Sequence, residues 1–556
     1  MSRTIDPWKK KSNLLLLSRL DETISICYRQ GLYLKAAQAA EKACQIAGET
    51  YGPGHRSAAV YAGNAARMRK AYEENCLHSM KEKEAASPKT TRGKRRFRPA
   101  FGVAAVLALA LFVTAGFAQG AANGAAEIPP PVYAAVSTAD GMNMPYYNIE
   151  ADFDPASRMV EGTEEVTFMC REAVEEVKFN LYMNRYRDSS LDSSEIRRYA
   201  VRNGQDAGNI EIEDVTYNGE TVYFEVKGET LSVAPGTGGF LRGEHNLLIK
   251  FRVKIPYIAD RVGGSEKGIW LGNWLPVLSA DNRENRPTEI GDPFVNMSST
   301  YQFRFSVPQD FNLILCNANT IQQEGGRKIY TGVLERVRDL PVFLNRGYRE
   351  AVTKEGEIEV HYYYYSPDSR PEAVLAAARK ALAFFNKNVG KYPWQQLNIV
   401  ENDMFLNGME YSTMILISKG TSRGNLPNTV FHEVAHQWFY NIVGSDQYNA
   451  PYIDEGLVEF FTAYAQSGRV PGYTGDTGGL NRSLEGFGSW QDYRNVHYRN
   501  GRKLFEQLYL LLGKNEFDNF IKEYYDRYKF GFVSATEFRM ILDGKLREDQ
   551  VSQLLD

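Results

Sequence analysis

The segment spanning residues 428–444 constrains the fold more than any other part of the chain. It places His432 and His436 four residues apart, with Glu433 between them, in an otherwise apolar run, although the 556 residues include only seven histidines. Residues four apart lie on one face of an α-helix, so both imidazoles can point at one metal ion. A buried histidine pair without a metal would be costly. The pattern therefore favours a buried, metal-binding helix over this segment, and satisfied core histidines are the alternative.

A third metal ligand is expected after a gap of eighteen residues. Glu455 follows His436 after an eighteen-residue gap, at the start of a helical pattern over residues 454–466. A second helix there can return the Glu455 carboxylate to the same ion. Two histidines, a carboxylate and a water form a catalytic zinc site with an open position. We therefore predict one Zn²⁺ held by His432, His436 and Glu455, with Glu433 as the general base.

Two further stretches complete a specific combination of motifs. Upstream, Gly408, Met409 and Glu410 lie between two hydrophobic runs, and downstream Tyr498 is followed three residues later by Gly501. With the zinc motif, this G-x-M-E sequence and this Y-x-x-G sequence resemble those of the zinc aminopeptidases of the aminopeptidase N family, within the gluzincin group. The resemblance covers the chain from about residue 144 to its last residue.

The resemblance implies a role for each matching position. Glu410 would bind the free α-amino group of a peptide substrate, and the backbone of Gly408 and Met409 would line the substrate groove as an edge strand. Tyr498 would donate a hydrogen bond to the oxyanion, so that developing negative charge meets a phenol beside the metal. The implied activity is that of a metallopeptidase hydrolase, which removes N-terminal residues from peptides by attack of a zinc-activated water.

The chain also departs from the commonest sequences of that family. Tyr411 stands where asparagine is usual, and Asn407 stands where a small residue is usual. The gap before Tyr498 is short, which leaves Tyr493 as the alternative oxyanion donor. Glu459 is expected either to orient a zinc-binding histidine or to be a solvated helix residue. The second residue that anchors the substrate amine is unassigned, and the chain resembles the short bacterial-type members without the C-terminal helical array.

Hydrophobic periodicity divides the region of resemblance into two predicted domains. Between residues 145 and 351 apolar and polar residues alternate with period two, and this predicts a mainly antiparallel β domain. From residue 352 to residue 556, helical patterns follow one further β run, which predicts an α-rich domain. The resemblance implies that this domain is a thermolysin-like zinc peptidase domain. The expected fold class is therefore a multidomain protein, as the length of the chain also requires.

An uncharged stretch precedes these domains and predicts a membrane anchor. Residues 89–98 carry six cations and no anion, residues 99–126 carry no charge, and the apolar part at 101–118 can cross a bilayer as a helix. The cations lie on the N-terminal side, which predicts a cytoplasmic N-terminus and an extracytoplasmic catalytic domain. A cleaved export signal and a buried core helix are the alternatives. The expected parts are a basic linker at 81–98, a transmembrane helix at 99–121 and a linker at 122–144.

The first 80 residues are expected to form a cytosolic helical segment. Residues 13–76 resemble a tetratricopeptide unit of the kinesin-light-chain type, but only about one and a half repeats are present, fewer than such units usually need to form a core. This segment either binds a cytosolic protein partner or is a small helical hairpin. A net charge of −3 argues against nucleic acid as a partner.

Three expectations bear on compartment and activity. Cys170 and Cys316 would lie outside the cytosol, where a disulfide between them is permitted but not required. A thermolysin-type endopeptidase is the first alternative function, if the cleft is open enough for a chain to pass through. A non-catalytic membrane scaffold or peptide sensor is the second, although intact metal ligands and an intact base argue against it.

Overall fold

The structure is a computed structural model that describes most of the chain after residue 142. It covers residues 143–187, 200, 207–236, 238–286, 288–471 and 477–555, the short strands between residues 133 and 137, and scattered positions among the first 70. The chain separates into two compact units, Met1–Pro129 and Pro130–Asp556. Most of the tetratricopeptide-like segment at 13–76 and all of the predicted transmembrane helix at 99–121 lie outside the described residues. Within the described part, no helix has the length and apolar character needed to cross a membrane.

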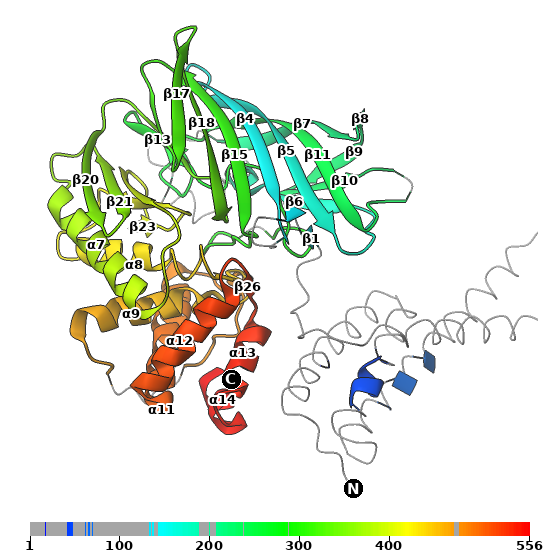
Figure 1. Cartoon of the computed structure of the whole chain (residues 1–556), viewed down its shortest axis with the longest axis vertical. Helices are drawn as coiled ribbons and strands as arrows, with labels where there is room; N and C mark the ends of the chain where they lie inside the picture. The colour runs from blue at the N-terminus through cyan, green and yellow to red at the C-terminus, as the bar shows by residue number, and fades with distance from the viewer. Residues whose placement is uncertain are drawn as a thin grey trace, which may run out of the picture. The chain divides into compact units, whose positions relative to one another are not determined.

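A nine-stranded sheet dominates the first part of the second unit (Figure 1). Neighbouring strands in this sheet are antiparallel except for one parallel pair, β15 with β4. This confirms the predicted, mainly antiparallel β-rich domain. In sheet order the strands are β17 (Ala318–Glu324), β18 (Arg327–Val337), β15 (Ser299–Pro308), β4 (Tyr146–Asp154), β5 (Met159–Cys170), β11 (Gly243–Lys254), β7 (Asn209–Tyr217) and β8 (Glu220–Thr221), with β1 (Tyr133–Ala134) paired to β5.

Smaller sheets also belong to this β-rich part. One has the order β14 (Val277–Leu278), β6 (Val177–Asn180), β10 (Thr230–Ala234) and β9 (Tyr223–Lys227). Another has the order β12 (Gly263–Gly264), β13 (Gly268–Leu271), β19 (Val342–Asn345) and β16 (Asn312–Ile314), and β2 (Val136–Ser137) pairs with β3 (Asn143–Met144). The 3₁₀ helix η1 (Tyr182–Tyr186) follows β6.

Cys170 and Cys316 do not form a disulfide. Cys170 ends β5, and Cys316 lies in the turn between β16 and β17. Both thiols are buried and free. Burial raises the pKa of each to about 11, so both stay protonated at neutral pH.

A five-stranded sheet begins the predicted catalytic domain. Its order is β20 (Arg349–Glu355), β21 (Ile358–Tyr364), β22 (Gln396–Asn402), β24 (Met414–Ser418) and β23 (Gly408–Met409). Strands β21, β22 and β24 run parallel, whereas β20 and β23 run antiparallel to their neighbours. Strand β23 therefore lies at the edge of the sheet, where its backbone can face a groove. Strand β20 starts slightly before residue 352, the predicted start of the catalytic domain.

Helices form the remainder of the second unit and confirm the predicted α-rich character. Figure 1 shows them in yellow-green to red below the large sheet. They are α7 (Pro371–Asn388), α8 (Leu426–Ala435), α9 (Glu455–Ser467), α10 (Trp490–Tyr493), the π-helix η4 (Arg494–Asn500), α11 (Gly501–Leu512), α12 (Lys514–Tyr528), α13 (Ala535–Asp543) and α14 (Glu548–Leu555). Two short 3₁₀ helices, η2 (Pro451–Ile453) and η3 (Leu484–Gly486), and the paired strands β25 (Gly444–Ser445) and β26 (Phe532–Val533) lie between them.

The helix predicted over residues 428–444 is wrong in its extent, because α8 starts earlier and ends at Ala435. Beyond that point, the backbone N–H groups of residues 441–443 bind carbonyls five residues earlier, so the turns become wider. Gly444 then enters the pair of β25 with β26. A Cβ at Gly444 would lie 2.2 Å from the guanidinium carbon of Arg338. Contacts with residues distant in sequence, in β26 and at Arg338, therefore accompany the end of the helix.

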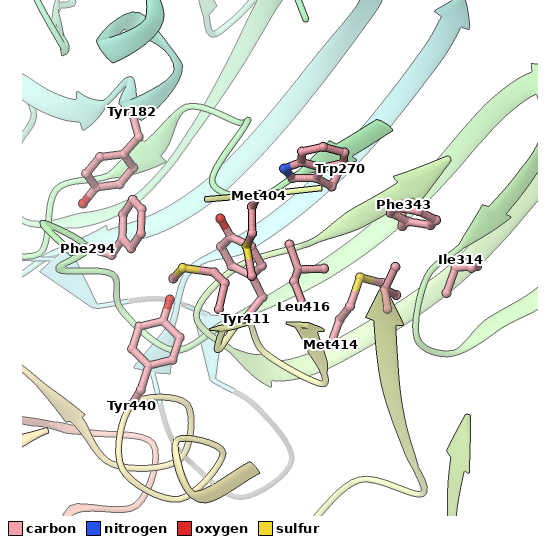
Figure 2. Packing of buried hydrophobic residues seen from close by; sticks show 12 residues of the cluster. Tyr182, Trp270, Phe294, Ile314, Phe343, Met404, Tyr411, Met414, Leu416 and Tyr440 are labelled. Carbon is pink, nitrogen blue, oxygen red and sulfur yellow. The ribbon is translucent and has the colours of Figure 1, made fainter. Parts of the chain in front are cut away.

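A buried cluster joins the β-rich part to the catalytic sheet (Figure 2). Tyr411 lies in it, and the Tyr411 hydroxyl donates a hydrogen bond to the backbone carbonyl of Arg261 at 2.9 Å. A Cβ on Gly272 would lie 1.8 Å from the Tyr411 ring, so glycine makes room for this tyrosine. Tyr411 therefore fastens the segment after β23 to the β-rich part. The cluster comprises Tyr182, Trp270, Phe294, Ile314, Phe343, Val400, Met404, Met409, Tyr411, Met414, Leu416 and Tyr440.

Candidate active site

Three side chains from two helices meet at one point. His432 lies in the last turn of α8, His436 caps its end, and Glu455 begins α9. The Nε2 atoms of the two histidines are 3.1 Å apart, and they lie 3.4 and 3.5 Å from Oε2 of Glu455. Zinc bonds of about 2.0–2.1 Å in tetrahedral geometry separate ligand atoms by about 3.3 Å. These three atoms therefore have the spacing of the ligands of one zinc ion.

The hydrogen bonds around the ligands favour a cation at this point. Nδ1 of His436 lies 2.7 Å from a carboxylate oxygen of Asp454, and Nδ1 of His432 lies 3.2 Å from one of Glu459. A ring that donates from Nδ1 presents the lone pair of Nε2 on its other side. Oε2 of Glu455 is buried and has no hydrogen-bond partner within the described structure. Three electron-rich atoms that face one another away from water fit a metal ion.

The electrostatic field at the site is strongly negative. Burial alone would lower the pKa of His432, but the adjacent carboxylates of Glu455 and Glu459 outweigh burial and raise this pKa to about 10. Burial also opposes protonation of His436, yet the carboxylates of Asp454 and Glu410 raise its pKa well above the usual value. The field that attracts a proton to these rings also favours a divalent cation.

Glu433 lies between the metal ligands and strand β23. Burial raises the pKa of its carboxyl to about 7, although the neighbouring histidines act in the opposite direction. Oε2 of Glu433 has no hydrogen-bond partner within the described region, and the side chain lines the cavity. A Cβ on Gly408 would lie 2.1 Å from Oε1 of Glu433, so a larger residue in the edge strand would require this carboxylate to move. Glu433 is thus a confined carboxylate that can accept a proton.

Glu410 belongs to a group of three carboxylates on one side of the metal ligands. Oxygen atoms of Asp292, Glu410 and Glu455 lie within 4.8 Å of one another, and all three residues are buried. Asp292 comes from the β-rich part, where its carboxylate forms an ion pair with Arg261. Such a group can bind a small cation such as an ammonium. No motif in the sequence marks Asp292, since only the packing of the two parts brings it here.

Tyr498 touches the metal ligands directly. Its hydroxyl donates a hydrogen bond to Oε1 of Glu455 at 2.5 Å, and its ring stacks on that of His432 with centroids 6.2 Å apart. Tyr493 packs edge-on against Tyr498, with centroids 5.6 Å apart, and is buried. Of the two tyrosines considered as oxyanion donors, Tyr498 is therefore the one whose hydroxyl lies at the ligand set.

Two glycines bring Tyr498 to this position. Gly456 follows Glu455 in α9, and Gly501 begins α11 directly after η4. A Cβ on Gly456 would lie 2.6 Å from backbone atoms of Gly501, and a Cβ on Gly501 would lie 2.9 Å from Gly456. The two backbones are therefore in direct contact, which sets the distance between Tyr498 and the third ligand.

The site opens into a cavity of about 380 Å³. Gly408 and Met409 in β23 line it on one side, as expected of an edge strand beside a substrate groove. Residues of α8 and α9 and of the segment from Trp490 to Arg502 line it on the other sides. The cavity has room for a few residues of an extended peptide.

Comparison with known proteins supports a peptidase domain in this region. The Peptidase family M1 domain matches residues 374–476, which include all three metal ligands and Glu433. Tyr498 lies beyond the matched residues. Residues 374–476 thus match the domain of peptidase family M1, and similarity to that family implies zinc as the metal.

Curated relatives and solved structures agree with this match. Aminopeptidase B of Rattus norvegicus is 22% identical over 52% of this chain and 49% of its own length. Leucine aminopeptidase 2 of Aspergillus fumigatus is 25% identical over 33% of this chain and 34% of its own. The chain thus spans about half or less of these relatives. The M1 zinc metallopeptidase of Deinococcus radiodurans shares the fold, with a TM-score of 0.53 at 15% identity over 74% of this chain and 92% of its own.

A second structure from Deinococcus radiodurans holds a peptide. It is a variant of the same M1 zinc metallopeptidase bound to a Tyr-Ser-Ala substrate, with a TM-score of 0.52 at 15% identity, and it covers 74% of this chain and 92% of its own. These similarities to solved structures show the fold, a β-rich part followed by an α-rich part.

Proposed function

We propose that this chain, with its family M1 peptidase domain, is a zinc-dependent aminopeptidase that removes N-terminal residues from peptides. The observation that carries the proposal is the convergence of His432, His436 and Glu455 at the spacing of zinc ligands, beside a buried Glu433. The names of the curated relatives, Aminopeptidase B and Leucine aminopeptidase 2, support the same activity.

The chemistry divides between the metal and the side chains around it. Zinc held by the two histidines and Glu455 would supply an activated water and polarise the scissile carbonyl. Glu433 accepts the proton from the attacking water and delivers it to the leaving amine. Tyr498 turns its phenolic hydrogen toward the carbonyl oxygen as negative charge develops there.

The carboxylate group at Asp292, Glu410 and Glu455 supports exopeptidase activity. In an unblocked peptide, the free α-amino group of the first residue places a positive charge next to the first peptide bond. Asp292 and Glu410 lie within 4.8 Å of the metal ligand Glu455, so they can hold that ammonium while the first peptide bond lies at the metal. Asp292 therefore fills the role of the second amine anchor.

Blocking the substrate amine tests the proposal against its alternatives. We expect turnover of aminoacyl-coumarin substrates, and loss of at least about 100-fold in kcat/KM when the α-amino group is acetylated. Equal turnover of free and acetylated peptides would indicate a thermolysin-type endopeptidase. No turnover by a zinc-loaded chain would favour a non-catalytic scaffold or peptide sensor.

We also propose that residues 99–121 anchor the chain in a membrane, with residues 1–80 in the cytoplasm and the catalytic part outside it. The support is the run of six cations followed by an uncharged apolar stretch. In this arrangement, residues 13–76 are available to a cytosolic protein partner. Capture of such a partner by the isolated segment, but not by the catalytic part, tests that role.

A further inference from the structure

Gln447 links the substrate-binding carboxylate to the surroundings of a metal ligand. It lies between α8 and α9, and only 1% of its surface is exposed. Its side-chain Nε2 donates to Oδ2 of Asp454 at 2.6 Å and reaches Oε1 of Glu410 at 3.4 Å. The other oxygen of Asp454 binds Nδ1 of His436. One buried amide thus connects Glu410 with Asp454, and through Asp454 with His436.

Glu410 needs such a donor because three of its neighbours are carboxylates. Burial raises the pKa of its carboxyl; His436 lowers this pKa, whereas the negative charges of Asp292, Glu433 and Glu455 raise it. Within the described structure, Gln447 is the side chain that donates a hydrogen bond to Glu410. Without it, the carboxylate would be free to turn away from neighbours that repel it.

The contact between Asp454 and His436 does not depend on Gln447 alone. Asp454 lies directly before the metal ligand Glu455, and the interaction of Oδ1 with His436 is a direct one of 2.7 Å. Loss of the amide therefore removes the fixed orientation of Glu410, whereas the metal ligand keeps its carboxylate partner. The effect should fall on recognition of the amine rather than on metal binding.

We propose that Gln447 is a positioning residue that holds Glu410 in the orientation needed to bind the α-ammonium of the substrate. Through its shared contact with Asp454, it also fixes the distance between this amine subsite and the metal ligands. The inference rests on the proposed aminopeptidase function. It assigns a role to a residue that no sequence motif marks.

The variant Gln447→Met tests this role, since it keeps the length of the side chain and removes the amide. We expect KM for an aminoacyl-coumarin to rise on the order of tenfold, as for the loss of a hydrogen bond to a charged group, while kcat changes less than about threefold. Zinc content should remain one ion per chain. An unchanged KM, or equal losses in kcat and kcat/KM, would contradict the proposal.

A pair of inhibitors separates positioning from general damage. An amino-acid hydroxamate carries the free amine, and its desamino analogue lacks it. In Gln447→Met, binding of the first should weaken by on the order of tenfold and binding of the second should not change. Equal weakening of both would overturn the role. A wild-type enzyme that binds both equally would overturn the aminopeptidase proposal itself, so the two failures are distinguishable.

Two further variants distinguish the loss of the Gln447 amide from an effect of misfolding. Asn398→Leu removes another fully buried amide, in β22, where its side-chain oxygen accepts from Gln396 at 2.8 Å; it should leave the inhibitor ratio unchanged. Gln447→Asn keeps the amide but shortens the side chain, so that it cannot reach both carboxylates. It should reproduce the loss in amine recognition if Gln447→Met does not fold, and a wild-type inhibitor ratio in Gln447→Asn would then count against the proposal.

Discussion

His432 and His436 each turn one ring nitrogen toward a carboxylate and the other toward Glu455. The motif spacing predicted that the His432 and His436 rings converge, because residues four apart share a helical face wherever a helix forms. The spacing could not reveal Asp454, whose contact with His436 Nδ1 depends on how the chain returns between the two helices. Nor could it reveal Asp292, which comes from another part of the fold.

Glu433→Gln should abolish hydrolysis and leave the metal in place. The substitution keeps the size of the side chain but removes the group that accepts the proton from the attacking water. We expect kcat to fall by about 10²–10⁴-fold, with zinc content unchanged. Steady-state kinetics and elemental analysis of the same preparation measure both, and near-normal activity would remove Glu433 from the mechanism.

Asp454→Asn should weaken zinc binding. The carboxylate fixes the orientation of the His436 ring and raises its basicity, and loss of such a partner typically costs about 10–100-fold in metal affinity. Competition with a chelator measures this. The control is Asp446→Asn, whose carboxylate binds Asn449 and lies outside the ligand set. Equal affinities in wild type and Asp454→Asn would show that the contact is incidental.

At the scale of elements, backbone contact between α9 and α11 positions the oxyanion donor. The sequence predicted a helix after Tyr498, but not that Gly456 and Gly501 touch, since a glycine in a helical pattern does not identify its neighbour. Tyr498 was therefore only one candidate of two from the sequence. In the structure, the glycine contact brings its hydroxyl to Glu455.

Gly501→Ala should impair catalysis without loss of zinc. An added Cβ would lie 2.9 Å from Gly456, so α11 and η4 must move away from α9 and carry Tyr498 with them. A displacement of about 1 Å can cost as much as 100-fold in rate, and we expect kcat to fall by about 10–100-fold. Gly488→Ala is the matched control, because no atom lies within 4 Å of its added Cβ. Wild-type kcat in Gly501→Ala would contradict this account of the contact.

Strand β5 contains a polar exception that periodicity could not predict. Its inward positions alternate as expected, yet Glu164 occupies one of them, fully buried. Neither carboxylate oxygen has a hydrogen-bond partner within the described residues. Burial raises the pKa of Glu164 well above its usual value. The folded state therefore holds a proton that the unfolded chain releases above about pH 4.5.

Glu164→Met should stabilise the protein at neutral pH. In the wild type, the stability contributed by this proton is present below about pH 4.5 and is lost as pH rises toward the folded-state pKa. Methionine has no proton to release, so the variant is not destabilised in this way as pH rises. We expect its free energy of unfolding to exceed that of the wild type by about 1–3 kcal/mol at pH 7, with a smaller difference at pH 4. Urea unfolding at both pH values measures it, and a pH-independent difference would contradict the assignment.

At the scale of the molecule, the order of a β-rich part before an α-rich part followed from the change of hydrophobic period. The contacts that join the two parts could not be predicted from this change of period. Arg338 is buried at the end of β18, and its guanidinium donates to the backbone carbonyls of Asn296, Tyr440 and Gly531. These carbonyls belong to the β-rich part, the turn after α8 and the segment before β26. One arginine thus joins three regions whose proximity no local pattern encodes.

Membrane association is a prediction about the whole chain. If residues 99–121 form an anchor, the full-length protein should remain in the membrane pellet after alkaline carbonate extraction, and removal of these residues should release it. Protease added to intact cells or spheroplasts should reach the catalytic part but not residues 1–80. Recovery of the full-length chain in the soluble fraction would contradict the anchor.

The most direct test of the central claim is X-ray absorption at the zinc edge of the purified protein. The account predicts one zinc per chain, with two imidazole nitrogens and one carboxylate oxygen at about 2.0–2.2 Å and a further light-atom ligand. Loss of one imidazole from this shell in His436→Ala would identify the site. Absence of bound zinc, or an unchanged shell in that variant, would contradict the account.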